Sequence, residues 1–336
     1  MRNFGIGRAV VAALAIVFGC VGGAAASDYK GSTITLIVAT GPGGGYAQVG
    51  QLLARHMPKH VPGHPTMIVQ FQPAAGGLQA ANYLYNAAPQ DGSVIALLRN
   101  STTFGQAMKL SGVKYDAAKF HWIGSVEPVI NVLGARKNSG VMSLADLAKK
   151  ELIVGAAGKL DTLYIFPTVM QKMLGYKFKV VTGYRGTNDV FAALDRNEVG
   201  GMVQPYDNWE RSHLHRQGEM SYLTQFSYER IKRLPNTPTM VELAKNPDER
   251  RILRLVSVPS VLGRNIAAPP KAPKDRVAIL RAAFNATMKD EAFISEMHRG
   301  NRSVEPLTGE AVEKMVGEVL STPDALIERT RSYLGY

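Results

Sequence analysis

The sequence predicts an α/β protein of two domains with mainly parallel sheets, joined by a crossing hinge. Short apolar runs rich in β-branched residues alternate with segments of helical periodicity along most of the chain. Glycine-rich loops follow several of these runs, and 336 residues with 46% hydrophobic content supply enough apolar material for two cores. Because parallel strands end at the same edge of a sheet, the loops after them are expected to meet where α/β proteins bind ligands.

The chain begins with a segment typical of a secretory signal peptide. Two arginines precede a short apolar run, residues 9–18, and small residues follow up to Ala26. This arrangement predicts cleavage after Ala26 and export of a chain without cysteine, because the single cysteine, Cys20, lies inside the segment. Lipid attachment at Cys20 is disfavoured, since Phe18 stands where lipoprotein signals prefer a small residue. No later run approaches the roughly 18 apolar residues of a membrane span.

The first strand after the signal is expected to end at a ligand. The apolar run 35–40 breaks into Gly41, Pro42 and three consecutive glycines at 43–45. Glycines let backbone N–H groups turn towards a guest, and the helix that follows, predicted to end near Pro58, adds partial positive charge at its first turn. This stretch therefore predicts a site for an anion.

A second loop of small residues repeats this arrangement. A predicted strand over residues 66–71 runs into the loop 73–77, and a helix follows as far as Tyr85. A third predicted strand, residues 93–98, leads directly to Arg99. Two such loops in one half of the chain indicate a ligand site more specifically than one loop does.

The second half of the chain repeats the order of strand, loop and helix without detectable sequence repetition. We expect domain I to comprise residues 28–127 plus 229–336, and domain II to comprise residues 128–228. Apolar runs at 122–126 and 129–135 end the first half, and the second run is expected to cross between the domains.

The elements expected in the second half follow from the same patterns. Its strands are predicted over 152–156, 179–182 and 199–203, and its helices over 144–150, from the loop at 157–162 to Gly175, and over 190–196. Residues 252–258 and 261–268 are expected to return the chain to domain I, before four final helices over 276–288, 291–299, 309–320 and 323–333.

The sequence lacks the motifs of the common enzyme classes. The dinucleotide pattern G-x-G-x-x-G fails at Tyr46, a phosphate-binding loop fails because Gln51 stands where lysine is needed, and no G-x-S-x-G elbow occurs. His56, His60 and His64 recur at four-residue intervals, but prolines and a glycine between them break the helix that would align them. We therefore expect no catalytic residue, no metal site and no cofactor.

The charge balance is basic, with a formal net charge of +12. The lysines and arginines are scattered and do not alternate with aromatic residues, so a solvated basic surface is favoured over nucleic-acid binding. Arg99, and Arg185 in a loop of the second half, are candidates for charge-assisted bonds to an organic carboxylate, with simple surface exposure as the alternative.

Seven short motifs, taken in order, resemble the Bug-type solute receptors of tripartite tricarboxylate transporters. After the signal peptide they are PGGG at 42–45, PAAGG at 73–77, APQDG at 88–92, GAAG at 155–158, YRG at 184–186, LPNTPT at 234–239 and APP at 268–270. The likeness covers nearly the whole mature chain.

The resemblance implies a type II periplasmic binding-protein fold whose two domains close over a small di- or tricarboxylate or an aromatic acid. It also implies a periplasmic receptor, expected to be a monomer, that delivers its ligand to the membrane subunits of a transporter. The two glycine loops are then expected to grip the carboxylate through Gly44, Gly45, Tyr46, Ala75, Gly76 and Gly77. The residues expected to face them from domain II are Gly158, Asp161, Thr162, Tyr184, Arg185, Gln204 and Tyr206.

The chain departs from the family pattern at two places. Tyr46 and Ala47 stand where members usually carry Ser or Thr and then Asp, and Gln204 stands where many members carry Asp. Both changes leave the carboxylate grip intact and disfavour an amino-acid ligand.

Two other classes of protein stay open as alternatives. An exported hydrolase or lyase acting on an anionic substrate is disfavoured because the chain lacks a recognisable nucleophile and metal set. An effector domain of a LysR-like regulator shares the expected fold, but it would need a helix-turn-helix where this chain has a signal peptide.

Overall fold

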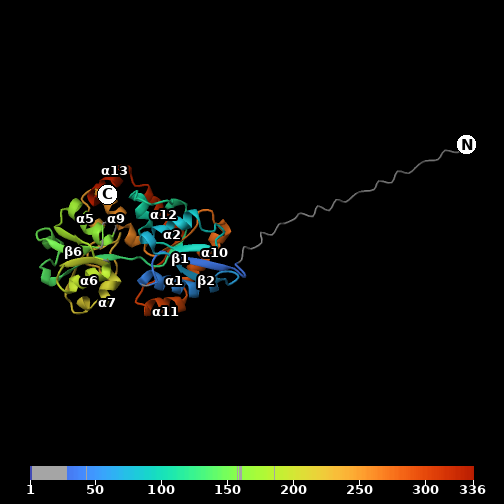
Figure 1. Ribbon diagram of the computed structural model, residues 1–336, viewed down its shortest axis with the longest axis horizontal. Helices are drawn as coiled ribbons and strands as arrows, with labels where there is room; N and C mark the ends of the chain where they lie inside the picture. The colour runs from blue at the N-terminus through green and yellow to red at the C-terminus, as the bar shows by residue number, and fades with distance from the viewer. Residues whose placement is uncertain (2–28, 43, 157, 159–160, 185) are drawn as a thin grey trace.

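The structure consists of two sheets that lie side by side, each with helices on both faces (Figure 1). The computed structural model describes residue 1 and residues 29–42, 44–156, 158, 161–184 and 186–336. The predicted signal peptide with Cys20, and the predicted ligand contact Arg185, lie outside the described residues. Within the described ranges, no helix has both the length and the apolar character needed to cross a membrane.

The first sheet gathers strands from the beginning and the end of the chain. In spatial order they are β11 (Leu307–Thr308), β4 (His121–Ser125), β10 (Asn265–Ala268), β3 (Val94–Leu97), β1 (Thr33–Val38) and β2 (Thr66–Phe71). β3 and β10 are buried along their whole length, which explains why their sequences read as continuous apolar runs.

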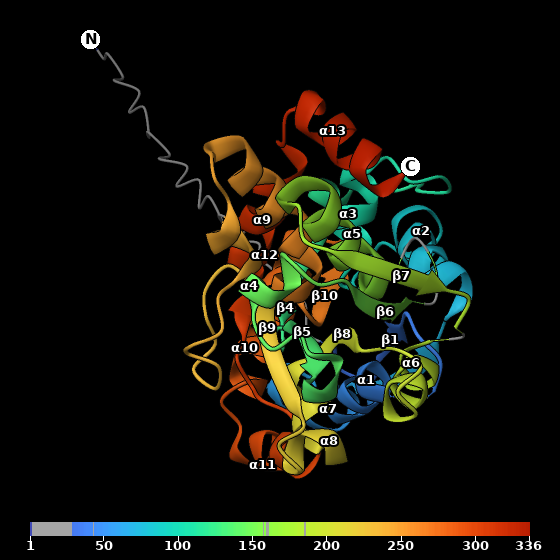
Figure 2. The ribbon, with the colours of Figure 1, turned by 90° about the vertical axis from the view of Figure 1, so that its left-hand side faces the viewer.

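The second sheet is built from the middle of the chain. In spatial order its strands are β7 (Phe178–Thr182), β6 (Leu152–Ala156), β8 (Gly201–Pro205), β5 (Asn131–Arg136) and β9 (Met220–Phe226). Helix α5 (Thr162–Leu174) covers one face, and α6 (Thr187–Asp195) and α7 (Tyr206–Arg211) lie on the other (Figure 2).

The predicted fold class is confirmed, with one difference in how the strands pair. The sequence predicted mainly parallel sheets, but both sheets are mixed. β1 is parallel to β2 and β3, and β6 to β7 and β8, whereas β10 runs antiparallel to its neighbours β3 and β4, and β5 to β8 and β9. The strand before β10 along the chain is β9 of the other sheet, and the long helix α9 (Pro247–Leu262) connects the two. No strand–helix–strand crossover within one sheet therefore fixes the direction of β10 as parallel.

The other helices complete the two layered units. They are α1 (Gly44–His56), α2 (Leu78–Asn86), α3 (Thr102–Ala107), α4 (Leu144–Leu147), α8 (His213–Arg216), α10 (Lys274–Thr287), α11 (Glu291–Arg299), α12 (Gly309–Leu320) and α13 (Asp324–Leu334). The last of them, α13, packs against both α5 and α9.

Several elements were not assigned from the sequence, and α9 and β9 are the longest of them. The apolar segment 252–258 forms the middle of α9, and residues 220–226 form β9. In α9 most side chains after Ile252 are buried, so the segment shows no exposed polar face to reveal the helical period.

Two segments that connect the sheets are bound to each other beside Glu127. The backbone N–H of Val126 donates to the carbonyl of Arg264 at 3.0 Å, and the N–H of Arg264 donates to the carbonyl of Glu127 at 3.0 Å. This crossing borders the candidate site described below. The exact partition into domains stays a prediction.

Candidate ligand-binding site

A cavity of about 700 Å³ lies between the two sheets, and both glycine loops reach it. Nine of the predicted ligand contacts line this cavity: Gly45, Tyr46, Ala75, Gly76, Gly77, Arg99, Gly158, Asp161 and Thr162. They follow β1, β2, β3 and β6, four strands whose ends converge on the cavity. The structure thus brings these residues together, and their role as ligand contacts stays a prediction.

Gly45 allows two arginine side chains to lie directly against the first loop. A Cβ atom at this position would lie 2.3 Å from Nη2 of Arg302 and 2.5 Å from Nη2 of Arg264. Any side chain at residue 45 would therefore displace these guanidiniums.

The second loop turns through three consecutive residues with positive φ. These are Ala75 (φ 51°), Gly76 (φ 65°) and Gly77 (φ 91°), a conformation that glycine adopts at little cost and alanine does not. A Cβ atom at residue 77 would lie 2.3 Å from Cγ of Arg99 and 2.9 Å from the carbonyl oxygen of Ala39. The loop therefore approaches both the end of β1 and the arginine that follows β3.

Tyr46 is held between two guanidiniums. Its hydroxyl accepts a hydrogen bond from the backbone N–H of Asn100 at 3.0 Å and donates to the carbonyl of Gly263 at 3.4 Å. The Cζ atoms of Arg99 and Arg264 lie 5.3 and 5.2 Å from the centre of its ring. The aromatic ring thus stabilises two cations side by side at the wall of the cavity.

The buried carboxylate of Glu127 neutralises only part of this positive charge. Its Oε1 accepts from Nη1 of Arg264 at 2.7 Å and from Nη1 of Arg302 at 3.3 Å, and the glutamate is fully buried. Burial raises the pKa of Glu127, and the two guanidiniums oppose that rise. One carboxylate therefore serves two buried arginines, of which Arg264 lines the cavity.

Arg99 and Arg264 each carry a donor that the protein leaves unused. Among the described residues, no group accepts a hydrogen bond from Nε of either arginine, although both nitrogens are buried. A buried N–H without an acceptor costs free energy unless something else accepts from it, so these two donors favour an anionic guest.

Asp161 is the acidic side chain that the described cavity lining contains. Its Oδ1 accepts from the backbone N–H of Leu163 at 3.2 Å, which caps the start of α5. Burial raises the pKa of Asp161, and the Arg99 guanidinium counteracts this. The aspartate thus has a structural role as a cap in addition to its place in the cavity.

Several polar residues of the cavity were not identified from the sequence. Asn100 donates from Nδ2 to the carbonyl of Pro259 at 2.7 Å, and Asn131 donates from Nδ2 to Oγ of Ser260 at 3.0 Å. Arg264 was also missed, because nothing in its local sequence separates it from the other scattered arginines. Only the path of the chain around Gly263 brings Arg264 to the cavity.

The cavity lining lacks four of the predicted contacts that the structure describes: Gly44, Tyr184, Gln204 and Tyr206. Gln204 is buried in β8, and the ring of Tyr206 packs edge-on against Tyr222 with 5.4 Å between the ring centres. Tyr184 lies beside Gly155 in the second sheet. A direct role for these side chains as ligand contacts stays a prediction.

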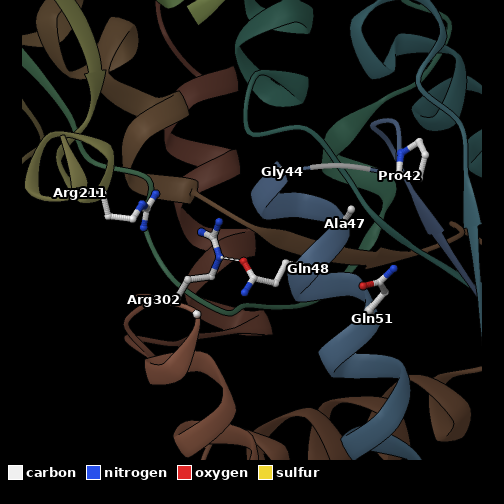
Figure 3. A pocket seen from close by; sticks show the side chains of 8 residues that line it. Pro42, Gly44, Ala47, Gln48, Gln51, Arg211 and Arg302 are labelled. Carbon is white, nitrogen blue, oxygen red and sulfur yellow. Dashed lines mark hydrogen bonds between the residues drawn. The ribbon is translucent and has the colours of Figure 1, made fainter. Parts of the chain in front are cut away.

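Gly44 lines a separate groove of about 410 Å³, together with Gln48, Arg211 and Arg302 (Figure 3). Arg302 at this groove donates from Nε to Oε1 of Gln48 at 2.9 Å, and Arg211 donates from Nη1 to the carbonyl of Asn301 at 3.1 Å. The second glycine loop does not line this groove, whereas both loops line the cavity.

The described residues offer no cluster of three or more His, Cys, Asp or Glu side chains that could hold a metal ion. What converges on the cavity is a set of hydrogen-bond donors: two glycine loops, two guanidiniums and several amide and hydroxyl groups. This arrangement can bind an anion through donors fixed by the fold.

The fold and the donor-rich cavity define a solute-binding receptor of the type II periplasmic binding-protein class. The family described as "Tripartite tricarboxylate transporter family receptor" matches residues 51–331, and the chain belongs to this family. The resemblance predicted from the sequence motifs is therefore confirmed.

Solved structures share this fold at low sequence identity. A TctC solute-binding protein from Polaromonas is 20% identical, with 88% of this chain and 98% of that chain covered and a TM-score of 0.69. A protein from R. palustris solved with adipate is 19% identical, with 90% and 97% covered and a TM-score of 0.64. MatC from Rhodopseudomonas palustris, solved with bound malate, is 20% identical, with 90% and 98% covered and a TM-score of 0.61. No curated protein sequence matches the chain.

Proposed function

We propose that this chain is a periplasmic receptor that binds a small organic carboxylate in the cavity between its two sheets and delivers it to the membrane subunits of a tripartite tricarboxylate transporter. The receptor family supports this assignment, and so do two structures with the same fold, one solved with adipate and one with bound malate. The ligand is a small organic carboxylate, with di- and tricarboxylates and aromatic acids as the first classes to test, and it leaves chemically unchanged.

One observation carries the proposal. Arg99 and Arg264 line the same cavity as the two glycine loops, and the Nε group of each has no hydrogen-bond acceptor among the described residues. A carboxylate offers several acceptor positions, so it could accept from a guanidinium and from loop N–H groups at once. Charge-assisted hydrogen bonds of this kind typically contribute about 1.5–3 kcal/mol each.

Binding is expected to hold the two sheets together around the ligand. Residues 45–46 and 75–77 approach the cavity from one sheet, and residues 161–162 approach it from the other. A ligand that contacts both sides stabilises the arrangement in which the sides are close, which is the usual basis of closure in binding proteins.

The proposal is tested on protein that has been unfolded, freed of bound solute and refolded. A panel of di- and tricarboxylic, aliphatic and aromatic acids is compared with the matching uncharged amides by thermal unfolding and calorimetric titration. At a concentration of 100 Kd, a binding acid stabilises the protein by about 2.7 kcal/mol. We expect stabilisation by at least one acid and none by its amide.

Two further measurements make this test specific. Arg264→Gln removes a guanidinium from the cavity while Glu127 keeps Arg302 as its partner, and it should weaken the best acid by about tenfold or more. Chromatography of the incubated acid should recover it unchanged. Equal binding of acid and amide, or conversion of the acid to a product, would contradict the proposal.

A further inference from the structure

Resting on the proposed function, we infer that the preferred ligand is a monocarboxylate with an apolar body, aliphatic or aromatic, and not a compact di- or tricarboxylate. The carboxylate binds beside Tyr46, and the apolar body lies against a set of side chains that we call the apolar wall. The apolar wall comprises Leu78, Phe104, Leu110, Val113, Ile165 and Tyr336.

The apolar wall is assembled from elements on both sides of the cavity. Leu78 begins α2, Phe104 lies in α3, and Ile165 lies in α5 beside the other sheet. All six side chains line the same cavity as the glycine loops. A solute held in the cavity therefore meets an extended apolar surface in addition to the donors.

The polar and apolar parts of the cavity belong to different packing clusters. Phe104 and Ile165 are part of one hydrophobic cluster, and Leu78, Leu110, Val113 and Tyr336 pack against it. Tyr46, between its two guanidiniums, is part of another cluster. The cavity thus has a cationic side at Tyr46 and a separate apolar side, which is the pattern that fits an amphipathic ligand.

Part of the apolar wall is incompletely buried by the protein itself. Leu78, Leu110 and Val113 are only half-buried, although each lines the cavity. Covering such side chains with an apolar ligand removes their surface from water and is favourable. A second carboxylate placed against them would lose hydration and find only neighbouring hydroxyl groups, such as that of Ser111, in place of water, which is less favourable.

The test uses acids that share one carboxylate and differ in the rest of the molecule. Refolded, ligand-free full chain is titrated with butanoate, hexanoate, adipate and 3-phenylpropanoate by calorimetry. Two added methylenes should make hexanoate bind about fifteenfold more tightly than butanoate, at about fourfold for each buried methylene. Adipate has the length of hexanoate with a carboxylate in place of the methyl group, and it should bind at least tenfold more weakly than hexanoate.

Variants locate the effect at the apolar wall. Leu110→Asn, and separately Val113→Thr, which preserves the shape of valine, should weaken hexanoate at least threefold while changing butanoate less. Ile153→Asn on the outer surface of β6 is the matched control and should change neither affinity, because Ile153 is exposed and outside the cavity. Thermal midpoints without ligand verify that each variant folds.

The titration results distinguish a failure of this inference from a failure of the proposed function. If adipate or citrate binds as tightly as hexanoate and 3-phenylpropanoate, or if hexanoate gains nothing over butanoate, the inference is wrong while the proposed carboxylate receptor stands. If no acid of the series or of the wider panel binds better than its amide, the proposed function and the inference both fall.

Discussion

Glu127 is the single carboxylate between two buried arginines, and its removal tests how the cationic side of the cavity is held together. Glu127→Gln leaves Arg264 and Arg302 side by side without a counter-charge. Breaking a buried ion pair on one side typically costs about 3–5 kcal/mol, so we expect a loss of this size in urea unfolding. Glu198→Gln, at an exposed pair with Arg196, should leave stability unchanged. If Glu127→Gln lowered the free energy of unfolding only slightly, water would already screen the charges of Arg264 and Arg302.

The raised pKa of Asp161 leads us to expect that its contribution to stability falls as pH rises. Because burial raises the pKa of Asp161, the folded chain keeps this proton at pH values where the unfolded chain has lost it. Its contribution is complete below about pH 4, the range of an unperturbed aspartate, and is lost as pH rises through the higher folded pKa.

The variant Asp161→Asn isolates this contribution. Asparagine still caps α5, as Asp161 does now, but has no proton to lose. The stability of the variant relative to the natural chain, measured by urea unfolding without ligand, should therefore increase from pH 4 upwards. Parallel stability curves for the two proteins would show that Asp161 ionises as freely when folded as when unfolded.

Among the elements, the turn from α9 into β10 depends most on glycine. Gly263 has φ +57°, and a Cβ atom there would lie 2.0 Å from the carbonyl oxygen of Glu127. Gly263→Ala should destabilise the protein by about 2 kcal/mol or more, because it combines a left-handed backbone with a clash against main chain. It should also weaken ligand binding, since Tyr46 and Arg264 are anchored at this turn.

A second glycine provides the matched control. Gly317 lies in the exposed middle of α12, and a Cβ atom there would contact nothing within 4 Å. Gly317→Ala should stabilise the protein by about 0.5–1 kcal/mol through the higher helix propensity of alanine. Thermal or urea unfolding measures both variants, and equal effects at the two positions would contradict the packing around Gly263.

Most elements could be predicted from the sequence because their signals are local. The strand over residues 66–71, the strand over 152–156 and the end of α5 at Gly175 were predicted as observed. The two glycine loops were likewise recognised from a few adjacent residues. β9 and α9 were not assigned, because their apolar side chains pack against segments that are distant in the sequence.

The candidate site was predicted only in part for the same reason. Gly45 and Gly77 are recognisable because a close approach to their backbone needs glycine. Arg264 and Asn131 reach the cavity through the crossing between the sheets, which no local pattern describes. Tyr206 follows a predicted strand, but its ring packs against Tyr222 instead of lining the cavity.

At the scale of the whole molecule, the cavity belongs to neither sheet alone. One side of it is supplied by the loops of the first sheet and the crossing segment, and the other by the start of α5. If the proposed function holds, a ligand gains its full set of contacts only when both sides are in place.

The most direct test of this account is a crystal structure of the refolded protein with its tightest-binding acid. We predict a carboxylate within about 2.7–3.2 Å of donors from the two glycine loops and from Arg99 or Arg264, with the body of the acid on the apolar wall. An acid bound in the groove beside Arg211 and Gln48, or outside the cavity altogether, would contradict the central claim.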